Sequence, residues 1–317
     1  MRASEAAPSR ASPCDACGNP SVLWVPYSGR RLCGGHFRET VERRARAELR
    51  RQLDGARDVR VAAAVSGGKD SLAALAILHD VLSPRRDASL VAISVDEGVE
   101  GYRAAGLEAA ARLCRALGVE HRIVRHADRF GTTTDAIVAR DAGASPCAAC
   151  GVLRRRALND AAREVEATHV ATGHNLDDLA QTILMNVARA DVARLGRLGP
   201  HVGKEREGLV PRLYPLRTIP EREVALYAHL RGLAAHLGEC PHSGTADRRF
   251  WRDLVLRMED AEPGARHRLL AFHDAVAPRL PPDGRPLVAC RQCGEPTSGD
   301  VCRACAVVAG LPGSRGA

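Results

Sequence analysis

The sequence predicts an α/β protein built on a doubly wound parallel sheet, with a zinc ribbon near each end of the chain. Two observations lead to this prediction. Short apolar, β-prone runs alternate with helical segments in the middle of the chain, and cysteines recur in closely spaced pairs near both ends. Because the apolar runs lack polar alternation, we expect helices on both faces of the sheet and ligands at the carboxyl ends of its strands.

Residues 1–40 form the predicted amino-terminal zinc finger. Cys14 and Cys17 make one pair, and Cys33 and His36 make a second pair after fifteen intervening residues. Each pair supplies two ligands from one tight turn, so the four side chains can close on one tetrahedral zinc ion. Unligated cysteines are the alternative, but two pairs at this spacing seldom arise by accident.

Residues 286–317 form the predicted carboxyl-terminal zinc ribbon. This module offers four thiolates in two pairs, from Cys290, Cys293, Cys302 and Cys305. A closed four-ligand zinc site is structural rather than catalytic. The residues between the two modules, 41–285, make up the predicted catalytic domain.

The central domain follows a strand–helix–strand order. Strands are predicted at 59–65, 90–95, 120–124 and 169–172, and helices at 71–81, 103–117 and 176–188. Beyond residue 218 the chain is predicted to be largely helical, with helices near 220–236 and 264–278. Ser66, Asp96 and Gly173 all follow strand ends, which is where a parallel sheet of this order places its active site.

The composition is that of a globular protein, which we expect to be cytoplasmic. No run approaches the roughly 20 apolar residues of a membrane helix, and no apolar signal core follows the amino terminus. Without a secretion signal, the 11 cysteines favour metal ligation or thiol chemistry over disulfides. The net charge of +8 favours a polyanionic partner, although a basic enzyme without one fits the charge as well.

Arginines crowd residues 38–60, which we expect to form a helix and its exit. The interpretation slightly favoured is that these arginines form a solvent-exposed helix face. The alternative is that they attract the backbone of an RNA by their charge. Aromatic residues make up only 3% of the chain, too few to indicate base-stacking platforms of the usual kind.

The segment Ser66-Gly67-Gly68-Lys69-Asp70-Ser71 joins the first predicted strand to the first predicted helix. Its glycines allow close backbone approach, and the helix start offers unpaired amides to an anion, so the segment predicts a phosphate cradle. Lys69 supplies a compact charge that suits phosphate in a tight loop. The spacing is not that of a Walker loop. It resembles instead the loop of adenine nucleotide α-hydrolase-like enzymes, which cleave ATP to AMP and pyrophosphate.

Three cysteines remain beside the terminal modules and Cys114, which falls in an apolar helix as a core residue: Cys147, Cys150 and Cys240. Three thiolates on a four-iron cluster leave one iron open for an external ligand such as sulfide. In the competing interpretation, one thiol forms a persulfide that attacks directly. The spacing of these cysteines in the sequence does not distinguish the cluster from the persulfide.

Asp177 and Asp178 open the helix that follows Gly173. Acidic residues in a first turn often only stabilise the helix, and that interpretation is credible for one of the two. His169 and His174 lie at a strand end and are more simply explained as structural.

Taken together and in their order, the motifs resemble those of the TtcA/TtuA family of tRNA 2-thiolation proteins and their wobble-uridine relatives, within the PP-loop ATP pyrophosphatases of Rossmann-like fold. The matching motifs are the two terminal modules, S-G-G-K-D-S, V-D-E-G at 95–98, C-x-x-C-G at 147–151, A-T-G-H-N-L-D-D at 171–178 and E-C-P at 239–241.

The resemblance implies a set of site residues. A [4Fe–4S] cluster would be held by Cys147, Cys150 and Cys240. ATP would be held by Ala64, Val65, Ser66, Gly67, Gly68, Lys69, Asp70, Ser71, Asp96, Arg154 and Gly173. The catalytic residues would be Asp178, Asp70, Lys69, Arg154, Cys147 and Cys240, with magnesium near the carboxylates and one zinc ion in each terminal module. Arg154 stands where members that modify the T-loop would carry lysine. Arginine there looks more like the wobble-modifying relatives, and the target uridine stays open.

The function implied is that of a tRNA uridine 2-sulfurtransferase, which adenylates the C2 carbonyl with ATP and replaces its oxygen by sulfur. Its partners would be tRNA and a sulfur donor, either a ubiquitin-like thiocarboxylate carrier or a cysteine desulfurase persulfide; a homodimer is left open. Two alternatives remain. One is another PP-loop ATP pyrophosphatase of the amide or lysidine synthetase type, and the other is a zinc-ribbon RNA-binding protein with an idle nucleotide loop.

Overall fold

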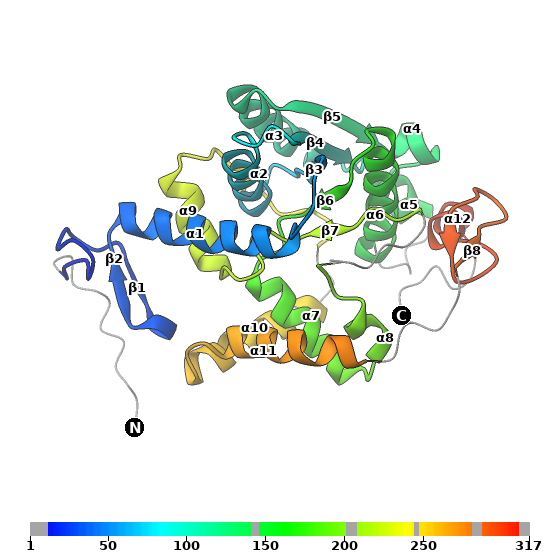
Figure 1. Cartoon of the computed structure of the whole chain (residues 1–317). Coiled ribbons are helices and arrows are strands. Elements are labelled where there is room, and N and C mark those ends of the chain that lie inside the picture. The colour runs from blue at the N-terminus through cyan, green and yellow to red at the C-terminus, as the bar shows by residue number, and fades with distance from the viewer. Residues whose placement is uncertain (1–11, 141–145, 201–207, 244–246, 281–286, 311–317) are drawn as a thin grey trace.

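The computed structural model describes residues 12–140, 146–200, 208–243, 247–280 and 287–310. A five-stranded parallel sheet of order β5-β4-β3-β6-β7 forms its centre (Figure 1). The strands are β3 (Val59–Ala64), β4 (Ala88–Asp96), β5 (Glu120–Arg125), β6 (His169–Ala171) and β7 (Arg212–Leu213). The predicted α/β class and all four predicted strands are confirmed. The fifth strand, β7, spans two residues and is too short to leave a pattern in the sequence.

Helices cover both faces of the sheet, as its apolar strands require. Alternate residues of β3 point to opposite sides: Val61 and Ala63 join one core, and Ala62 joins the other. The first core packs against α1 (Gly34–Gln52), α2 (Lys69–Leu82), α3 (Arg103–Leu117) and α9 (Glu221–Leu230). The second packs against α6 (Pro146–Glu164), a helix with no counterpart among the predicted elements.

The edge strand β5 departs from the prediction of strands buried on both faces. Its residues are mostly exposed, and Ile123 retains 39% of its accessible surface. The strand pairs on one side only, with β4, and carries charged side chains such as Glu120 and Arg122. Charges of this kind discourage another chain from pairing with a free edge.

A second group of helices packs beside the sheet. It consists of α7 (Leu176–Ala188), α8 (Val192–Gly196), α10 (Asp247–Ala261) and α11 (Ala265–Val276) (Figure 1). The predicted helix at 264–278 is therefore confirmed within two residues. The predicted helix at 220–236 is too long: α9 ends at Leu230, Gly232 adopts a left-handed φ of +64°, and residues 233–240 form neither helix nor strand.

The remaining elements are short. Helices α4 (His126–Phe130) and α5 (Thr134–Arg140) follow β5, and two 3₁₀ turns span Pro26–Ser28 and Ala277–Arg279. The two terminal modules lie at opposite ends of the molecule (Figure 1). The first contains the hairpin β1 (Leu23–Val25) and β2 (Arg30–Leu32); the second contains β8 (Val288–Ala289), β9 (Pro296–Thr297) and α12 (Arg303–Ala309). Among the helices described, none is long and apolar enough to cross a membrane.

Arg44 on α1 is an exception to the solvated face expected for the arginine run. Its guanidinium contacts Glu223 on α9 at 2.7 Å and donates a hydrogen bond to the hydroxyl of Tyr27 at 2.6 Å. Tyr27 belongs to the amino-terminal module and also donates to Glu223. Arg44 therefore fastens that module to the catalytic domain.

The loop between β3 and α2 is tightly packed against α3. Gly67 has a left-handed φ of +85°, and a Cβ added there would lie 1.9 Å from the carbonyl oxygen of Gly106. Gly68, its neighbour, has room: its nearest atom would be Ser66 Oγ at 3.6 Å. Only the first of the two glycines is fixed by sterics and backbone conformation.

We therefore expect Gly67→Ala to destabilise the fold by roughly 2–5 kcal/mol, since it combines a disfavoured conformation with a clash against backbone. Gly68→Ala is the matched control and should change stability little. Denaturant unfolding of both variants measures the difference. Equal stability of the two variants would contradict the packing described here.

Candidate functional site

The predicted phosphate cradle lies at the junction of β3 and α2. Gly68 caps α2 without any side-chain hydrogen bond, so the first amides of the helix are left to an external acceptor. Ser71 Oγ braces the loop, because it accepts from Ser66 N at 3.1 Å and donates to the Gly68 carbonyl at 2.9 Å. The loop is thus shaped to receive an anion such as phosphate.

Lys69 stands at the start of α2 between two carboxylates. Its Nζ donates to Asp70 at 2.8 Å and to Glu221 at 3.0 Å. Although desolvation opposes the shift, these two hydrogen bonds raise the pKa of Lys69. The ammonium group is therefore charged at neutral pH, as the neutralisation of phosphate requires.

The other predicted residues of the nucleotide site lie at the same edge of the sheet. Asp96 ends β4 and accepts from Gly98 N at 3.0 Å. Gly173 follows β6 and rests against α2: a Cβ there would lie 2.8 Å from the carbonyl carbon of Asp70. Asn175 donates to the Asp70 carboxylate at 3.2 Å. The ends of β3, β4 and β6 thus surround one site, with Ala64 and Val65 leading into the loop.

Asp177 and Asp178 occupy different surroundings. Asp177 is 4% exposed, pairs with Arg266 and accepts from Glu221 N at 2.7 Å. Asp178 closes a capping box with Asn175, and desolvation raises the pKa of its carboxyl. The charges that act on it, His174, Arg248 and Asp70, all belong to the site edge. Asp177 is therefore engaged in buried structural contacts, whereas Asp178 forms hydrogen bonds with Asn175, the residue that also donates to Asp70.

Glu97 and Arg103 contribute to the site but were missed in the sequence analysis. Arg103 is buried and donates to the carbonyls of Val95 and Ser66, both at 2.8 Å. Glu97, 6% exposed, contacts Arg103 at 2.9 Å and Arg154 at 3.6 Å. The V-D-E-G motif was the available signal, because it places a second acid after the strand end. Glu97 and Arg103 thus connect the loop after β3 to Arg154 through a continuous series of polar contacts.

The structure brings the three predicted cluster cysteines into one neighbourhood. Cys147 and Cys150 lie in the first turn of α6, and Arg154 follows one turn later, 3.9 Å from Cys150 Sγ. Cys147 Sγ donates to the His242 carbonyl at 3.4 Å, which brings the segment that carries Cys240 beside the pair. Desolvation raises the pKa of Cys150, and the charge of Cys240 acts in the same direction.

The three cysteines differ from the terminal sets in their spacing. In the part of the chain that is described, only the two terminal sets bring three or more ligand atoms within 4.8 Å of one another. A single ion needs such convergence, whereas a four-iron cube holds its ligands further apart. The donor set beside α6, three thiols with Arg154 next to Cys150, is of the chemical kind that holds an iron–sulfur cluster.

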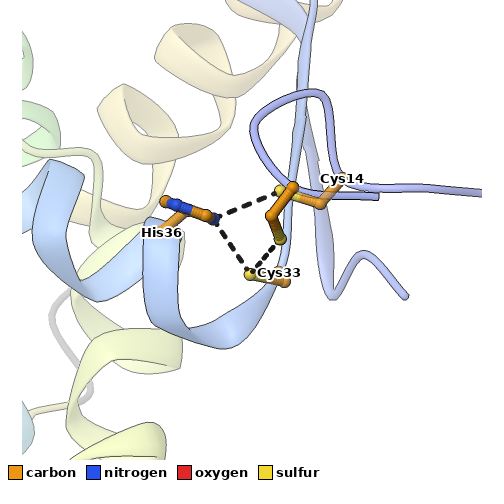
Figure 2. A group of neighbouring side chains, drawn as sticks. Cys14, Cys33 and His36 are labelled. Atoms are coloured by element: carbon orange, nitrogen blue, oxygen red, sulfur yellow. Dashed lines mark hydrogen bonds between the residues drawn. The ribbon is translucent and has the colours of Figure 1, made fainter. Parts of the chain in front are cut away.

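The amino-terminal set forms a compact group. Figure 2 shows Cys14, Cys33 and His36 pointing toward one another; His36 Nδ1 lies 3.6 Å from Cys14 Sγ and 3.3 Å from Cys33 Sγ. Cys17 Sγ lies 3.8 Å from Cys33 Sγ. Although desolvation opposes the shift, backbone hydrogen bonds lower the pKa of Cys14 to about 6, which favours the thiolate that metals bind. The four ligand atoms fit a structural zinc ion.

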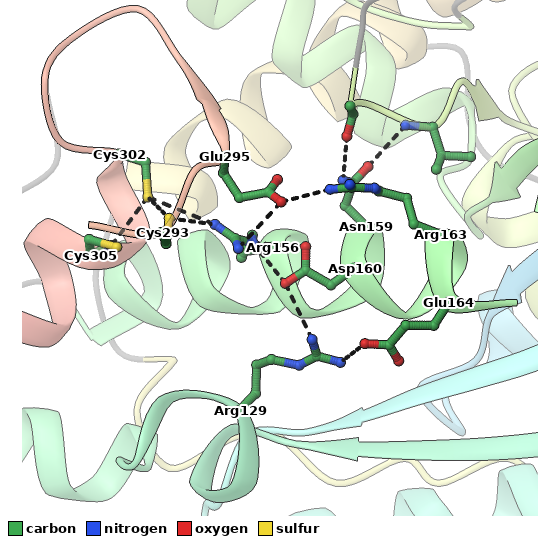
Figure 3. A network of polar contacts seen from close by, with 12 residues as sticks. Arg129, Arg156, Asn159, Asp160, Arg163, Glu164, Cys293, Glu295, Cys302 and Cys305 are labelled. Atoms are coloured by element: carbon green, nitrogen blue, oxygen red, sulfur yellow. Dashed lines mark hydrogen bonds and ion pairs between the residues drawn. The ribbon is translucent and has the colours of Figure 1, made fainter. Parts of the chain in front are cut away.

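The carboxyl-terminal set is equally compact, with Cys293 Sγ 3.7 Å from Cys302 Sγ and with Cys290 accepting from Cys302 N at 3.2 Å. It differs in having an arginine of the catalytic domain beside it. Arg156 on α6 donates to Cys293 Sγ at 3.3 Å (Figure 3). The ribbon is therefore docked on α6, the helix that carries Cys147 and Cys150.

Comparison with known proteins confirms the resemblance drawn from the motifs. Residues 38–257 match the family model of the PP-loop domain. The chain is 39% identical over 313 residues to the tRNA 2-thiolation protein NcsA of Haloferax volcanii, covering 93% of this chain and 98% of the relative. It is 41% identical to the cytoplasmic tRNA 2-thiolation protein 1 of Bos taurus, covering 94% of this chain and 87% of the relative.

The structure is also similar to a solved one. It matches the U34-tRNA thiolase NcsA from Methanococcus maripaludis with its [4Fe-4S] cluster, at a TM-score of 0.83 and 34% identity, over 94% of this chain and 96% of that chain. Since the family model and the relatives both cover most of the sequence, this chain belongs to the PP-loop family, among the tRNA 2-thiolation proteins.

Proposed function

We propose that the protein is a tRNA uridine 2-sulfurtransferase that consumes ATP and uses a [4Fe–4S] cluster. One observation carries the proposal: the segment after α9 links the two halves of the site. His236 N donates to the Gly67 carbonyl in the phosphate loop at 2.9 Å, and the His242 carbonyl accepts from Cys147 at 3.4 Å. Cys240 lies between these two anchors. Phosphate chemistry and thiol chemistry thus share one edge of the sheet.

In the first step, the loop amides and Lys69 hold the phosphates of ATP. The C2 oxygen of the uridine attacks the α-phosphorus, the bond to the β-phosphate oxygen breaks, and pyrophosphate leaves with its charge offset by Lys69. Asp178, Asp70 and Asp96 are the carboxylates that would hold a magnesium ion, which would offset further negative charge on the pyrophosphate. The product is a uridine whose C2 oxygen carries AMP.

In the second step, sulfur replaces that oxygen and AMP leaves with it. A [4Fe–4S] cluster bound by three thiolates supplies an open iron that can carry sulfide. Cys147, Cys150 and Cys240 are the thiolates that would hold it, and Arg154 lies beside Cys150 where it can offset negative charge. A persulfide on one of these cysteines is the alternative, and the cysteine variants below separate the two.

The substrate would be tRNA, and α10 offers a surface that suits it. Arg248, Arg249 and Arg252 are exposed near the start of α10, and Phe250 is 61% exposed beside Trp251, with ring centroids 5.2 Å apart. Arg252 contacts Glu221, which binds Lys69, and the charge of Arg248 acts on Asp178. Arginines and aromatic rings at the mouth of a site are what unpaired RNA bases stack against.

The names of the relatives support proposals for the target uridine and for the cellular location of this protein. Because the structural relative is named a U34-tRNA thiolase and Arg154 fits the wobble-modifying pattern, we propose the wobble uridine as the target. The mammalian relative is named cytoplasmic, which supports the same location here. A ubiquitin-like thiocarboxylate and a cysteine desulfurase persulfide both remain as donors. Assay of thiouridine formation from purified protein, ATP and tRNA, with each donor in turn, tests the activity.

Cysteine variants test the cluster. After anaerobic reconstitution, Cys147→Ser, Cys150→Ser and Cys240→Ser should each lose most of the cluster's visible absorption and all thiouridine formation, because a three-thiolate site cannot spare a ligand. Cys114→Ala, which removes a buried cysteine of α3, is the control and should keep both. Thiolation by protein without cluster would favour the persulfide route, and full activity of all three variants would contradict any thiol role.

Substitutions of the two neighbouring aspartates should affect different properties, one the stability of the fold and the other catalysis. Asp177→Asn breaks a buried ion pair with Arg266 and should lower the free energy of unfolding by about 3–5 kcal/mol with little effect on turnover. Asp178→Asn keeps an acceptor for the capping box, so it should preserve stability but lower turnover by roughly 100-fold or more. Denaturant unfolding and AMP release measure the two effects; the reverse pattern would overturn the assignment.

The RNA surface on α10 can be tested by fluorescence. The chain has 2 tryptophans, so Trp24→Phe leaves Trp251 as the sole reporter. Added tRNA should quench its emission, and Phe250→Ala should weaken tRNA binding by about tenfold, since one stacked base contributes about 1–3 kcal/mol. Phe272→Ala, which removes an exposed ring on α11, is the control. Unchanged emission at saturating tRNA would exclude this surface.

A further inference from the structure

We propose that the carboxyl-terminal zinc ribbon is a clamp on α6 that holds Cys147, Cys150 and Arg154 in place, and that Arg156 is its main positioning residue. The proposal rests on the proposed cluster role of those cysteines and goes beyond it. It assigns the ribbon a task within the catalytic domain. Four observations carry it.

The first observation is that the cysteine pair and the residues that contact the ribbon lie on different faces of α6. At roughly 100° per residue, Cys147, Cys150 and Arg154 share one face of the helix. Ala149, Leu153, Arg156 and Asp160 share another, well away from the first. Ala149 and Leu153 are buried in one apolar cluster with Cys290, Cys302, Ala304 and Val307 of the ribbon. The ribbon therefore backs the cluster-facing turn of the helix.

The second observation is the ionic network around Arg156 (Figure 3). Its Nε donates to both Asp160 oxygens, at 2.8 and 2.7 Å, and its Nη1 donates to Cys293 Sγ at 3.3 Å. Glu295 of the ribbon contacts Arg163 at 2.7 Å and Arg156 at 3.5 Å. With metal bound, four thiolates carry net negative charge, which this arginine offsets. Partners of this kind orient metal ligands and tune metal affinity.

The third observation is a second link, through α5. At its start, Thr134 N donates to the Glu97 carbonyl at 2.8 Å, and Asp135 contacts His242 at 2.6 Å, near Cys147. At its end, Arg140 donates to the carbonyls of Val307 and Val308, both at 2.9 Å. A cation there suits the carboxyl end of α12. The ribbon thus contacts both α6, which carries the cysteine pair, and α5, which precedes it in the chain.

The fourth observation excludes a ligand site at the same place. A hollow of about 440 Å³ lies beside the contact between the ribbon and α6, lined by Arg129, Arg156, Asp160, Arg163, Glu164 and Glu295. Positive and negative side chains balance there, and most are paired with one another. A phosphate would find no net positive charge, so the network serves attachment of the ribbon.

Hydrogen exchange of the zinc-loaded, cluster-free protein tests the clamp without any assay of activity. In Arg156→Gln, amides of residues 146–157 should exchange about tenfold faster, because charged hydrogen bonds to the ribbon are lost. Arg291→Gln is the matched control: Arg291 lies between the ribbon cysteines, its side chain is 77% exposed, and its partner Asp300 belongs to the ribbon itself. It should leave this exchange unchanged.

Removal of one zinc site at a time gives a second, independent test. Cys302→Ser should release zinc from the ribbon and speed exchange at 146–157, whereas Cys33→Ser should release zinc from the amino-terminal module and leave those amides protected. Iron bound after reconstitution should fall in Arg156→Gln and Cys302→Ser only. Unchanged exchange at 146–157 in both variants would overturn the proposal. Failure of the unaltered protein to bind iron would instead refute the proposed function.

Discussion

One main-chain hydrogen bond, from His236 N to the Gly67 carbonyl, joins the phosphate loop to the segment that carries Cys240. Gly67 can accept it because its left-handed backbone turns the loop against α3. The segment then continues to Cys147, where the His242 carbonyl accepts from the thiol. The predicted phosphate loop and three cysteines far from it in sequence are thus held at the same edge of the sheet.

Proximity is what the proposed reaction needs most. An adenylated uridine reacts with water if it waits for sulfur, whereas sulfur held next to the activated carbon makes the second step effectively intramolecular. A series of polar contacts joins the phosphate loop to the cysteine group. It runs from the Ser66 carbonyl through Arg103, Glu97 and Arg154 to Cys150. The ribbon behind α6 extends this support on the far side of the cysteines.

Local patterns predicted much of this structure, and long-range contacts account for most of what they missed. Strands such as β3, the glycine loop and the metal pairs were predictable because each has its own residue pattern. The end of α9 at Leu230 follows from a local signal, the left-handed Gly232 just beyond it, which the expectation of a longer helix overlooked. The exposed edge of β5, by contrast, depends on neighbours distant in sequence. The same holds for the contact of Arg156 with Cys293, and for Phe250 and Trp251, whose place near the site follows from the packing of α10 on α7. The sequence could not show that Asp177 is buried against Arg266 while its neighbour Asp178 closes a capping box.

The most direct test of the account follows the uridine oxygen. A tRNA carrying ¹⁸O at C2 of its target uridine is converted in a single turnover, and the AMP is analysed by mass spectrometry. The account predicts that the label appears in the phosphate of AMP, because that oxygen attacks the α-phosphorus and departs with it. Thiolated tRNA accompanied by AMP without label would contradict adenylation of the base.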